Sequence, residues 1–421
     1  MDAIMNFLND HFMPFAGRLA EQRHLKALRE GIVAVMPLLL VGSLFLIIAY
    51  PPIEALDTAV APFRGELSKV SNATFGILAL VASFSVAYSL SNSYKLDSLA
   101  SGIISVSAFL LSMPATDNGN IPAEWLGSKG LFVAMIIAIL AVEIQRFFME
   151  KNIFIKMPAE VPPFVARSFA ALLPGFVALL LVWIVNIVLL TTTKLTLPEA
   201  INIVLGIPIM NLGSSLPATL VAIVVIQLLW CVGIQGADIV AVFLGPVWLS
   251  LSEQNAVAKA AGEMLPNIIT NQFIYVFVFV GGAGATFALA LLLLKAKSSQ
   301  LKAIGKVGIW PAIFNINEPI TFGMPIIMNP VMFIPFILAP LAAAITTYIA
   351  MATNLVARPY AIVPWTTPVF ISGFLTTGDW KAIILQLVNI IIAAIIYYPF
   401  LRMWDKMKFD EETKQATEED V

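Results

Sequence analysis

Long runs of apolar residues, separated by short polar segments, dominate this chain. The clearest runs are residues 31–50, 75–90, 98–113, 130–142, 172–190, 216–232, 273–294, 330–351 and 382–401. A helix needs about 20 apolar residues to cross a hydrocarbon core of about 30 Å. Lipid offers no partner for backbone polar groups, so we predict an all-α polytopic membrane protein with about ten transmembrane helices.

Two further runs, residues 239–251 and 360–374, are too short or too interrupted by Pro and Gly to be assigned as spans. The span count around residues 239–272 and 355–378 therefore stays open. Gly281–Gly284 lies inside a predicted span, and we attribute it to close helix packing. It lacks the Lys-Ser/Thr of a phosphate-binding loop.

The pattern of apolar runs changes near residue 194. Up to that point the apolar runs are continuous, whereas later runs contain helix breakers beside polar side chains, at residues 206–208, 233–238, 267–271, 315–319 and 363–368. Broken backbone is tolerated at membrane depth where it is buried in protein or lines a water-filled cavity. We expect a scaffold domain at residues 28–194 and a substrate-handling domain with re-entrant segments at residues 195–402.

Basic residues gather in four short segments, which predict the orientation of the chain in the membrane. They are Arg18, Arg23, Lys26 and Arg29; Arg146, Lys151, Lys156 and Arg167; Lys295, Lys297, Lys302 and Lys306; and Arg402, Lys406 and Lys408. Lys and Arg accumulate on the cytoplasmic side, so both termini are expected there. An even number of crossings must then separate the second cluster from the third.

The two ends of the chain have their own patterns. Residues 1–27 place apolar side chains at helical intervals and predict an amphipathic segment that contacts lipid at the cytoplasmic interface: Ile4, Phe7, Leu8, Phe12, Phe15 and Leu19. The same residues carry charges throughout, so no cleavable signal peptide is expected. Residues 403–421 are expected to form a polar cytoplasmic tail, and its acidic part, Asp410 to Asp420, is expected to be disordered.

Composition excludes several classes of protein. Apolar residues make up 59% and charged residues 12%, whereas soluble domains have roughly 45 to 50% and about 25%. The formal charge is 24 − 26 = −2, so no basic field is present to bind nucleic acid. Cys231 is the single cysteine, and His11 and His24 are the only histidines. We therefore expect no disulfide framework, no metal site and no cofactor.

Glu318 is the strongest candidate for chemistry. It lies between Asn317 and Pro319, in a stretch from residue 309 to 327 without any other charge. A carboxylate at membrane depth is costly unless it is paired or faces water, and such groups usually lie on functional pathways. Pro319 disfavours a helical conformation at Glu318 and would place the carboxylate at a break. The alternative is a carboxylate that only stabilises a helix N-terminus.

Gln235 lies between two glycines, and its amide offers both a donor and an acceptor, which suits sugar hydroxyls. The alternative is an amide that caps a helix end. Asp238 could bind a coupling ion, but capping the following helix is the better interpretation. We keep it as a secondary candidate.

Aromatic and amide side chains complete the candidate site. The face of Trp365, in a Pro-bounded polar turn, suits the apolar face of a pyranose ring. Trp230 is an equally good candidate for an interfacial anchor. Asn271 and Asn317 occupy similar polar breaks.

Three ordered motifs resemble a known family. They are Asn315-Ile-Asn-Glu-Pro-Ile-Thr-Phe-Gly-Met-Pro325, Val363-Pro-Trp-Thr-Thr-Pro368 and Leu229-Trp-Cys-Val-Gly-Ile-Gln-Gly236. The chain resembles the enzyme IIC membrane subunit of the bacterial phosphoenolpyruvate-dependent sugar phosphotransferase system, of the lactose/cellobiose/diacetylchitobiose type. The resemblance covers nearly the whole chain.

This resemblance implies a fold and a function. It implies about ten transmembrane helices, a homodimer formed through the N-terminal half, and an elevator-type transport domain with re-entrant hairpins in a bacterial cytoplasmic membrane. The sugar would be a β-linked disaccharide. A separate IIB subunit, charged by IIA upstream, would phosphorylate the 6-hydroxyl on the cytoplasmic side. Whether the chain alone counts as an enzyme stays open, because the phosphocysteine is on another subunit.

The resemblance also assigns residues. Glu318 matches the family glutamate near the 6-hydroxyl, and Asn317 and Trp365 match sugar-contacting positions. Gln235 departs from the family, which usually has histidine there, and a glutamine has no titratable nitrogen. Either Glu318 suffices for phosphorylation, or sugar preference or phosphotransfer is altered. Cys231 lies in a predicted span and is expected to pack there rather than carry phosphate.

Two alternatives to a phosphotransferase permease remain at this point. One is an ion-coupled secondary sugar transporter in which Glu318 or Asp238 carries a proton. The other is a sugar-sensing membrane protein that does not transport. The sequence does not choose among cellobiose, diacetylchitobiose and lactose.

Overall fold

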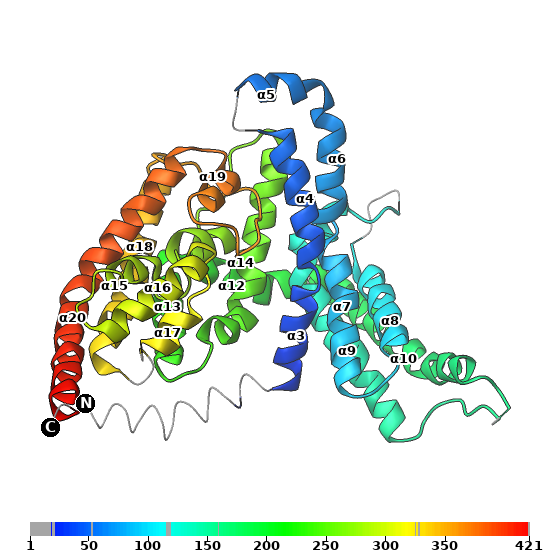
Figure 1. The fold of residues 1–421 in the computed structure, drawn as a ribbon. Helices are drawn as coiled ribbons and strands as arrows, with labels where there is room; N and C mark the ends of the chain where they lie inside the picture. The colour runs from blue at the N-terminus through cyan, green and yellow to red at the C-terminus, as the bar shows by residue number, and fades with distance from the viewer. Residues whose placement is uncertain are drawn as a thin grey trace.

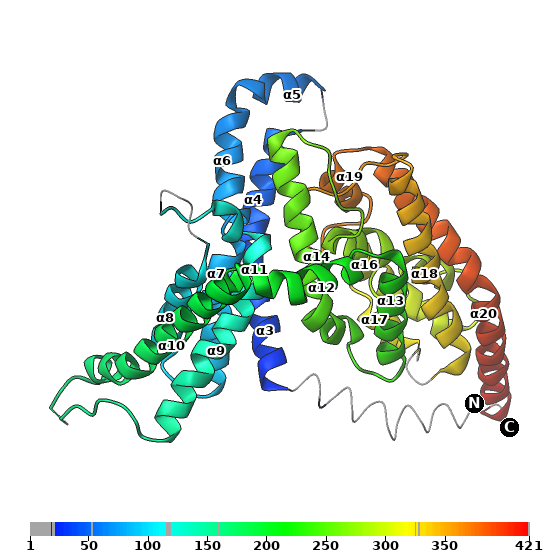
Figure 2. The ribbon, with the colours of Figure 1, turned by 180° about the vertical axis from the view of Figure 1, so that it is seen from behind.

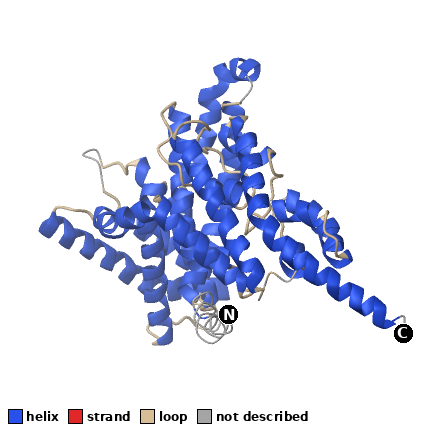
Figure 3. Cartoon of the chain, turned by 90° about the vertical axis from the view of Figure 1, so that its left-hand side faces the viewer, coloured by secondary structure: helices blue, strands red, loops and turns tan. Residues whose placement is uncertain are grey.

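The computed structural model describes Arg18 and residues 22–51, 54–114, 119–158, 160–324, 326 and 329–419. All regular structure within these ranges is helical, as Figure 3 shows. The apolar side chains of the predicted amphipathic segment, from Ile4 to Leu19, lie outside the described residues. The first described helix, α3, begins at Arg23, where the Gln22 side chain accepts a hydrogen bond from the Leu25 N–H at 2.7 Å.

The N-terminal half forms one helical body, seen on the right of Figure 1. Its helices are α3 (Arg23–Val33), α4 (Met36–Ala49), α5 (Glu54–Val60), η2 (Ala61–Phe63), α6 (Arg64–Phe75), α7 (Leu78–Ser93), α8 (Ser98–Ser112), η3 (Ala123–Trp125), η4 (Ser128–Gly130), α9 (Leu131–Glu150) and α10 (Pro163–Thr193).

Small residues allow the helices of this half to pack closely. A Cβ added to Gly31 would lie 2.5 Å from Cγ2 of Val86, so α3 and α7 are in direct backbone contact there. The buried hydroxyls of Ser83 and Ser105 share a hydrogen bond of 2.9 Å between α7 and α8. Lipid tails are as apolar as Leu, so helices in a membrane associate through such close contacts and interhelical hydrogen bonds.

The C-terminal half forms a second body. Its helices are α11 (Leu197–Ile201), η5 (Asn202–Gly206), α12 (Ile207–Gly213), α13 (Leu216–Cys231), α14 (Gly236–Ala261), η6 (Phe273–Val278), α15 (Phe287–Leu293), α16 (Ser299–Ile313), α17 (Glu318–Gly323), α18 (Pro330–Ala352), α19 (Ile371–Thr377) and α20 (Lys381–Glu419). Figure 2 shows α10, α11 and α12 leading from the first body to the second.

Helix α14 lies between the two bodies in Figures 1 and 2 and packs into both. Its Trp248 belongs to the large core of the C-terminal half. Leu249 and Ala256 instead pack in a core made mainly by α3, α4, α7 and α9. The two bodies therefore have separate main cores, and both α14 and residues 360–362 contribute to the core of the N-terminal half.

Seven helices in the described residues are long and apolar enough to cross a membrane, and eight if the bent pair Leu197–Gly213 and Leu216–Cys231 is one span. The pair bends by 75° at its break. A further apolar helix, Ser98–Ser112, is shorter than these. The chain is therefore an all-helical, multi-span membrane protein, as the apolar runs predicted.

The segment that we could not assign as a span is one of these helices. α14 has 26 residues, with Pro246 inside it, and meets the length and hydropathy expected of a span. The apolar run seemed too short because it ends at polar residues, among them Glu253 and Asn255. The side chains of both residues are buried, and both have hydrogen-bond partners in other segments.

The run at residues 273–294, predicted as one continuous span, is broken. The π-helix η6 ends at Val278 and α15 begins at Phe287. Between them Gly281, Gly282 and Gly284 have φ values of 81°, 99° and 84°, in the left-handed region that glycine adopts without steric cost. These glycines therefore form a turn rather than part of a continuous helix. Gly284 also allows close helix packing, because a Cβ there would lie 2.2 Å from the Phe336 ring on α18.

The prediction of a disordered C-terminal tail is also wrong, because α20 continues as a helix to Glu419. The Asp405 carboxylate accepts hydrogen bonds from the backbone N–H groups of Lys297 and Ser298 at 2.9 to 3.0 Å. Glu412 accepts from Ser299 and Gln300 at 2.9 and 3.0 Å. The acidic tail thus satisfies the N-terminal backbone donors of α16, an interaction that helix termini favour.

Candidate functional site

Three chain breaks of the C-terminal half meet at one place. The Asn315 side chain donates hydrogen bonds to the backbone oxygens of Trp365 and Thr367 at 2.8 and 3.1 Å, and accepts one from the Gly281 N–H at 2.9 Å. The Val369 N–H donates to the Ile313 carbonyl at 2.9 Å. The non-helical backbone of these segments is therefore satisfied within the protein, as membrane depth requires.

A second asparagine holds the glycine turn against the same hairpin. Asn317 is 4% exposed, and its Nδ2 donates to the Ala283 carbonyl at 2.7 Å. A Cβ at Gly282 would lie 2.6 Å from Cγ of Asn317. The close approach of the two segments thus requires glycine at position 282, as its φ of 99° also does.

Glu318 lies at the first position of α17, directly after this break. Its side chain is half-buried, and its buried Oε2 atom has no hydrogen-bond partner among the described residues. Buried carboxylate oxygens are nearly always hydrogen-bonded, and leaving one without a partner costs free energy. Glu318 therefore carries a buried acceptor that no described residue satisfies.

The backbone of Trp365 is held by hydrogen bonds, whereas its ring is exposed. Its carbonyl accepts from Asn315, and the Thr367 N–H closes the turn by donating to the Pro364 carbonyl at 2.9 Å. The side chain itself is 55% exposed. An indole ring held on a fixed backbone and left open on its face can stack on an apolar ring surface.

Gln235 and Asp238 lie at the start of α14. Gln235 is exposed, and its side chain makes no capping hydrogen bond, so the alternative of a capping amide does not describe it. Asp238 lies 3.8 Å from Nη1 of Arg29 on α3, and its side chain is 52% exposed. Asp238 thus contacts the N-terminal half. Among the described residues, no hydrogen bond or ion pair joins Gln235 or Asp238 to the Glu318 hairpin.

No hydrogen bond among the described residues joins the side chain of Trp230 or Asn271 to the three breaks. Trp230 is 6% exposed in the core of the C-terminal half, a position that favours a packing role. The Asn271 N–H donates to Ser252 Oγ at 3.0 Å, and its side-chain oxygen accepts from Gln272. Cys231 is fully buried beside Trp230, in agreement with the packing role expected for it.

Two polar residues of this region were not singled out from the sequence. Asn315 was visible only as part of a motif, and its role depends on contacts with distant segments. Glu253 on α14 is 4% exposed, and its Oε2 accepts from the Ser128 N–H at 3.0 Å. The sequence signal for Glu253 was a charge inside a span, which was missed because the span itself was not assigned.

Together, the multi-span helical fold and the polar site built from broken helices define the class of membrane permeases. A family model described as "Phosphotransferase system, EIIC" matches residues 29–340. The chain belongs to this EIIC family of the sugar phosphotransferase system.

Individual relatives agree over nearly the full length. The PTS system cellobiose-specific EIIC component of Geobacillus stearothermophilus is 48% identical, over 99% of this chain and 98% of that relative. The lichenan permease IIC component of Bacillus subtilis (strain 168) is 46% identical, over 98% of this chain and 96% of that relative. The crystal structure of ChbC, the IIC component from the N,N'-diacetylchitobiose-specific phosphotransferase system, matches with a TM-score of 0.92 and 46% identity, covering 97% of this chain and 99% of that one.

Proposed function

We propose that this protein is the membrane permease subunit of a bacterial phosphotransferase system for a β-linked disaccharide. It would move the sugar inward and present the 6-hydroxyl to a phosphorylated IIB subunit. The family and the relatives named for cellobiose, lichenan and diacetylchitobiose support the sugar class. The observation that carries the proposal is the buried carboxylate oxygen of Glu318, which has no partner among the described residues, in the hairpin that Asn315 joins to the Trp365 turn.

Each residue of the site has its own proposed role. Trp365 would stack on a pyranose face, and Asn317 and Gln235 would contact the sugar. Glu318 would hold the 6-hydroxyl and accept its proton as the oxygen attacks phosphorus. The sulfur–phosphorus bond of the IIB phosphocysteine then breaks, and the thiolate leaves. Cys231 cannot supply that thiolate because it is fully buried, so the phosphoryl donor is a separate subunit, recharged by IIA.

The two helical bodies suggest how the sugar moves. We place a scaffold at residues 28–194 and an elevator-type transport domain at residues 195–402, with about ten spans when shorter and re-entrant segments are included. Both termini would be cytoplasmic, on the side where Lys and Arg gather. The separate cores of the two bodies support this division. Asp238 is a poor proton carrier for an ion-coupled mechanism because it pairs with Arg29.

Replacing Gln235 with histidine should raise the rate of sugar phosphorylation by about tenfold, because imidazole adds a titratable nitrogen at this position. The exposed, uncapped side chain leaves room for the ring. Phosphorylation and affinity should be measured with cellobiose, diacetylchitobiose and lactose. Unchanged affinities would place Gln235 in the chemistry, whereas a changed order of preference would place it in recognition. No change in either would contradict a role for Gln235.

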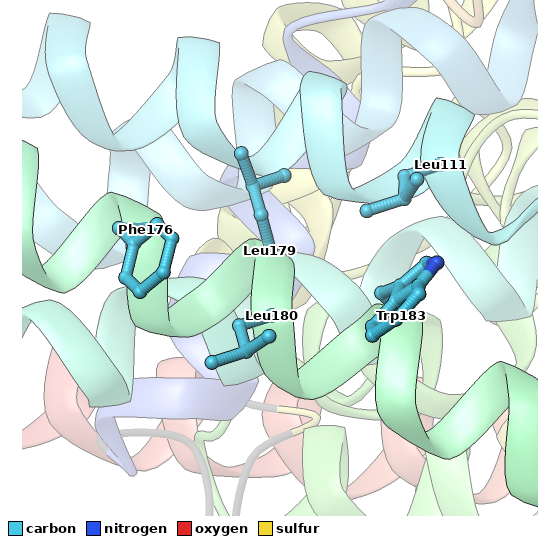
Figure 4. Close-up of a pocket in the computed structure, with 5 residues that line it drawn as sticks. All are labelled: Leu111, Phe176, Leu179, Leu180 and Trp183. Carbon is cyan, nitrogen blue, oxygen red and sulfur yellow. The ribbon is translucent and has the colours of Figure 1, made fainter.

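We also propose that the protein is a homodimer that pairs through α10. One face of α10 exposes large apolar side chains at intervals of three and four residues: Phe169, Leu172, Phe176, Leu180, Trp183, Ile187 and Leu190. Figure 4 shows part of this face, where Leu111 of α8 joins α10 residues around a shallow apolar groove. Residues at this spacing share one helix face and suit a second helix.

Disulfide cross-linking can test this interface. Trp183→Cys, combined with Cys231→Ser to remove the native thiol, should give a covalent dimer in membranes after mild oxidation. Ile395→Cys on α20 is the matched control, because Ile395 is 67% exposed and apolar but lies in the other body. A monomer without cross-links in the Trp183→Cys protein would show that α10 contacts only lipid.

A further inference from the structure

The side-chain amide of Asn315 makes three hydrogen bonds to the other two chain breaks. Its Oδ1 accepts from Gly281, which lies 34 residues earlier in the chain. Its Nδ2 donates to the carbonyls of Trp365 and Thr367, which lie 50 and 52 residues later. The residue is 8% exposed. One buried side chain therefore joins the glycine turn, the Glu318 hairpin and the Trp365 turn.

A local role explains only part of this arrangement. Asn315 follows the end of α16 with a φ of 61°, and its N–H donates to the Ala312 carbonyl at 3.0 Å. The next residue, Ile316, donates to the Pro311 carbonyl at 3.1 Å. Glycine and asparagine are the usual residues for such a helix end. Glycine would cap equally well, so the cap does not account for the three bonds of the side chain.

We infer that Asn315 is a positioning residue that sets the separation between Glu318 and Trp365 across the bound sugar. It lies three residues before Glu318 and holds the carbonyl of Trp365 itself. Besides this amide, the Val369 N–H to Ile313 carbonyl bond also joins the two segments. Loss of the amide donors would therefore leave the Trp365 turn attached but free to shift. The inference rests on the proposed sugar site.

Asn315→Asp is the direct test, because aspartate keeps an acceptor for Gly281 but loses the two N–H donors of the amide. A buried carboxyl that becomes protonated can donate to only one of the two carbonyls, so at least one carbonyl loses its donor and sugar affinity should fall by about tenfold or more. Asn389→Asp is the matched control. Asn389 is buried in the same half and donates to Phe277 and Thr347 at 2.9 Å, away from the breaks. The sugar affinity of Asn389→Asp should stay within about twofold of that of the native protein, while its melting temperature should fall about as much as that of Asn315→Asp.

A double-mutant cycle with Trp365→Ala separates positioning from general stability. If Asn315 acts through Trp365, adding Asn315→Asp to Trp365→Ala should weaken binding by far less than it does alone. Asn315→Gly keeps the helix end and removes all three bonds, so it should reproduce the loss if the aspartate variant does not fold. If the two substitutions together weaken binding by the product of their separate factors, the inference is overturned. Normal sugar affinity in either Asn315 variant would also overturn it.

The same measurements distinguish this inference from the proposed function. Weak binding by Trp365→Ala together with normal binding by the Asn315 variants would contradict the positioning role and leave the sugar site in place. Normal binding by Trp365→Ala would contradict the sugar site itself, and the role of Asn315 with it.

Discussion

Replacing Glu318 with glutamine should abolish phosphorylation of the sugar while leaving sugar binding measurable. The amide has nearly the same shape and still accepts a hydrogen bond from the 6-hydroxyl, but it cannot take the proton that the reaction releases. Loss of a general base costs about 10²- to 10⁴-fold in rate. Phosphorylation is measured as the initial rate of sugar phosphate formation with phosphorylated IIB, and sugar binding is measured by calorimetric titration.

Glu253→Gln is the matched control for this experiment. Glu253 is also a buried carboxylate of the C-terminal half, but its Oε2 accepts from the backbone of Ser128 in the N-terminal half, and an amide oxygen can accept the same bond. Phosphorylation by this variant should stay within a few-fold of the native rate. Full activity in Glu318→Gln would refute the role assigned to Glu318.

Removing the ring of Trp365 should weaken sugar binding by about 30-fold, which corresponds to about 2 kcal/mol for a stacked aromatic side chain. The protein should remain folded, because the ring is 55% exposed and the turn is held through the backbone carbonyl. Affinity and melting temperature should be measured for Trp365→Ala without phosphorylated IIB, so that binding is seen apart from chemistry.

Trp380→Ala provides the comparison for this variant. Trp380 is 61% exposed and lies between α19 and α20, outside the three breaks in sequence. Its removal should leave sugar affinity unchanged. Equal affinities for the two tryptophan variants would show that Trp365 does not stack on the sugar.

The sequence predicted the fold where a helix is apolar and uninterrupted. Residues 172–190 and 330–351 were recognised because their length and hydropathy match a membrane span, and both lie within single helices, α10 and α18. α14 was not recognised because its polar half is stabilised by tertiary contacts, such as that of Glu253 with Ser128. Periodicity within one segment carries no information about such partners.

At the glycine turn the sequence predicted a continuous span that the structure does not contain. Residues 273–294 have the composition of a span, yet the chain turns at Gly281 and Gly282, where φ is positive. Glycine permits both close helix packing and left-handed turns, so the residue type alone could not distinguish them. The deciding contacts, with Asn315 and Asn317, come from a hairpin more than 30 residues later.

The candidate site was only partly predictable for a related reason. A lone carboxylate in an apolar stretch identifies Glu318 from the sequence, because burial of a charge is costly wherever the chain folds. Trp365 followed from its polar, Pro-bounded turn. Asn315 is one amide among many in the sequence, and only the meeting of three distant segments gives it a distinct role.

Transport by this protein is expected to be coupled to phosphorylation of the sugar by a partner subunit. Proteoliposomes containing the purified protein, loaded with phosphorylated IIB inside and supplied with cellobiose outside, test it most directly. Sugar 6-phosphate should accumulate inside only when phosphorylated IIB is present, and Glu318→Gln should prevent this accumulation. Accumulation of unmodified sugar driven by a proton gradient without IIB would show that transport is coupled to protons instead of phosphorylation.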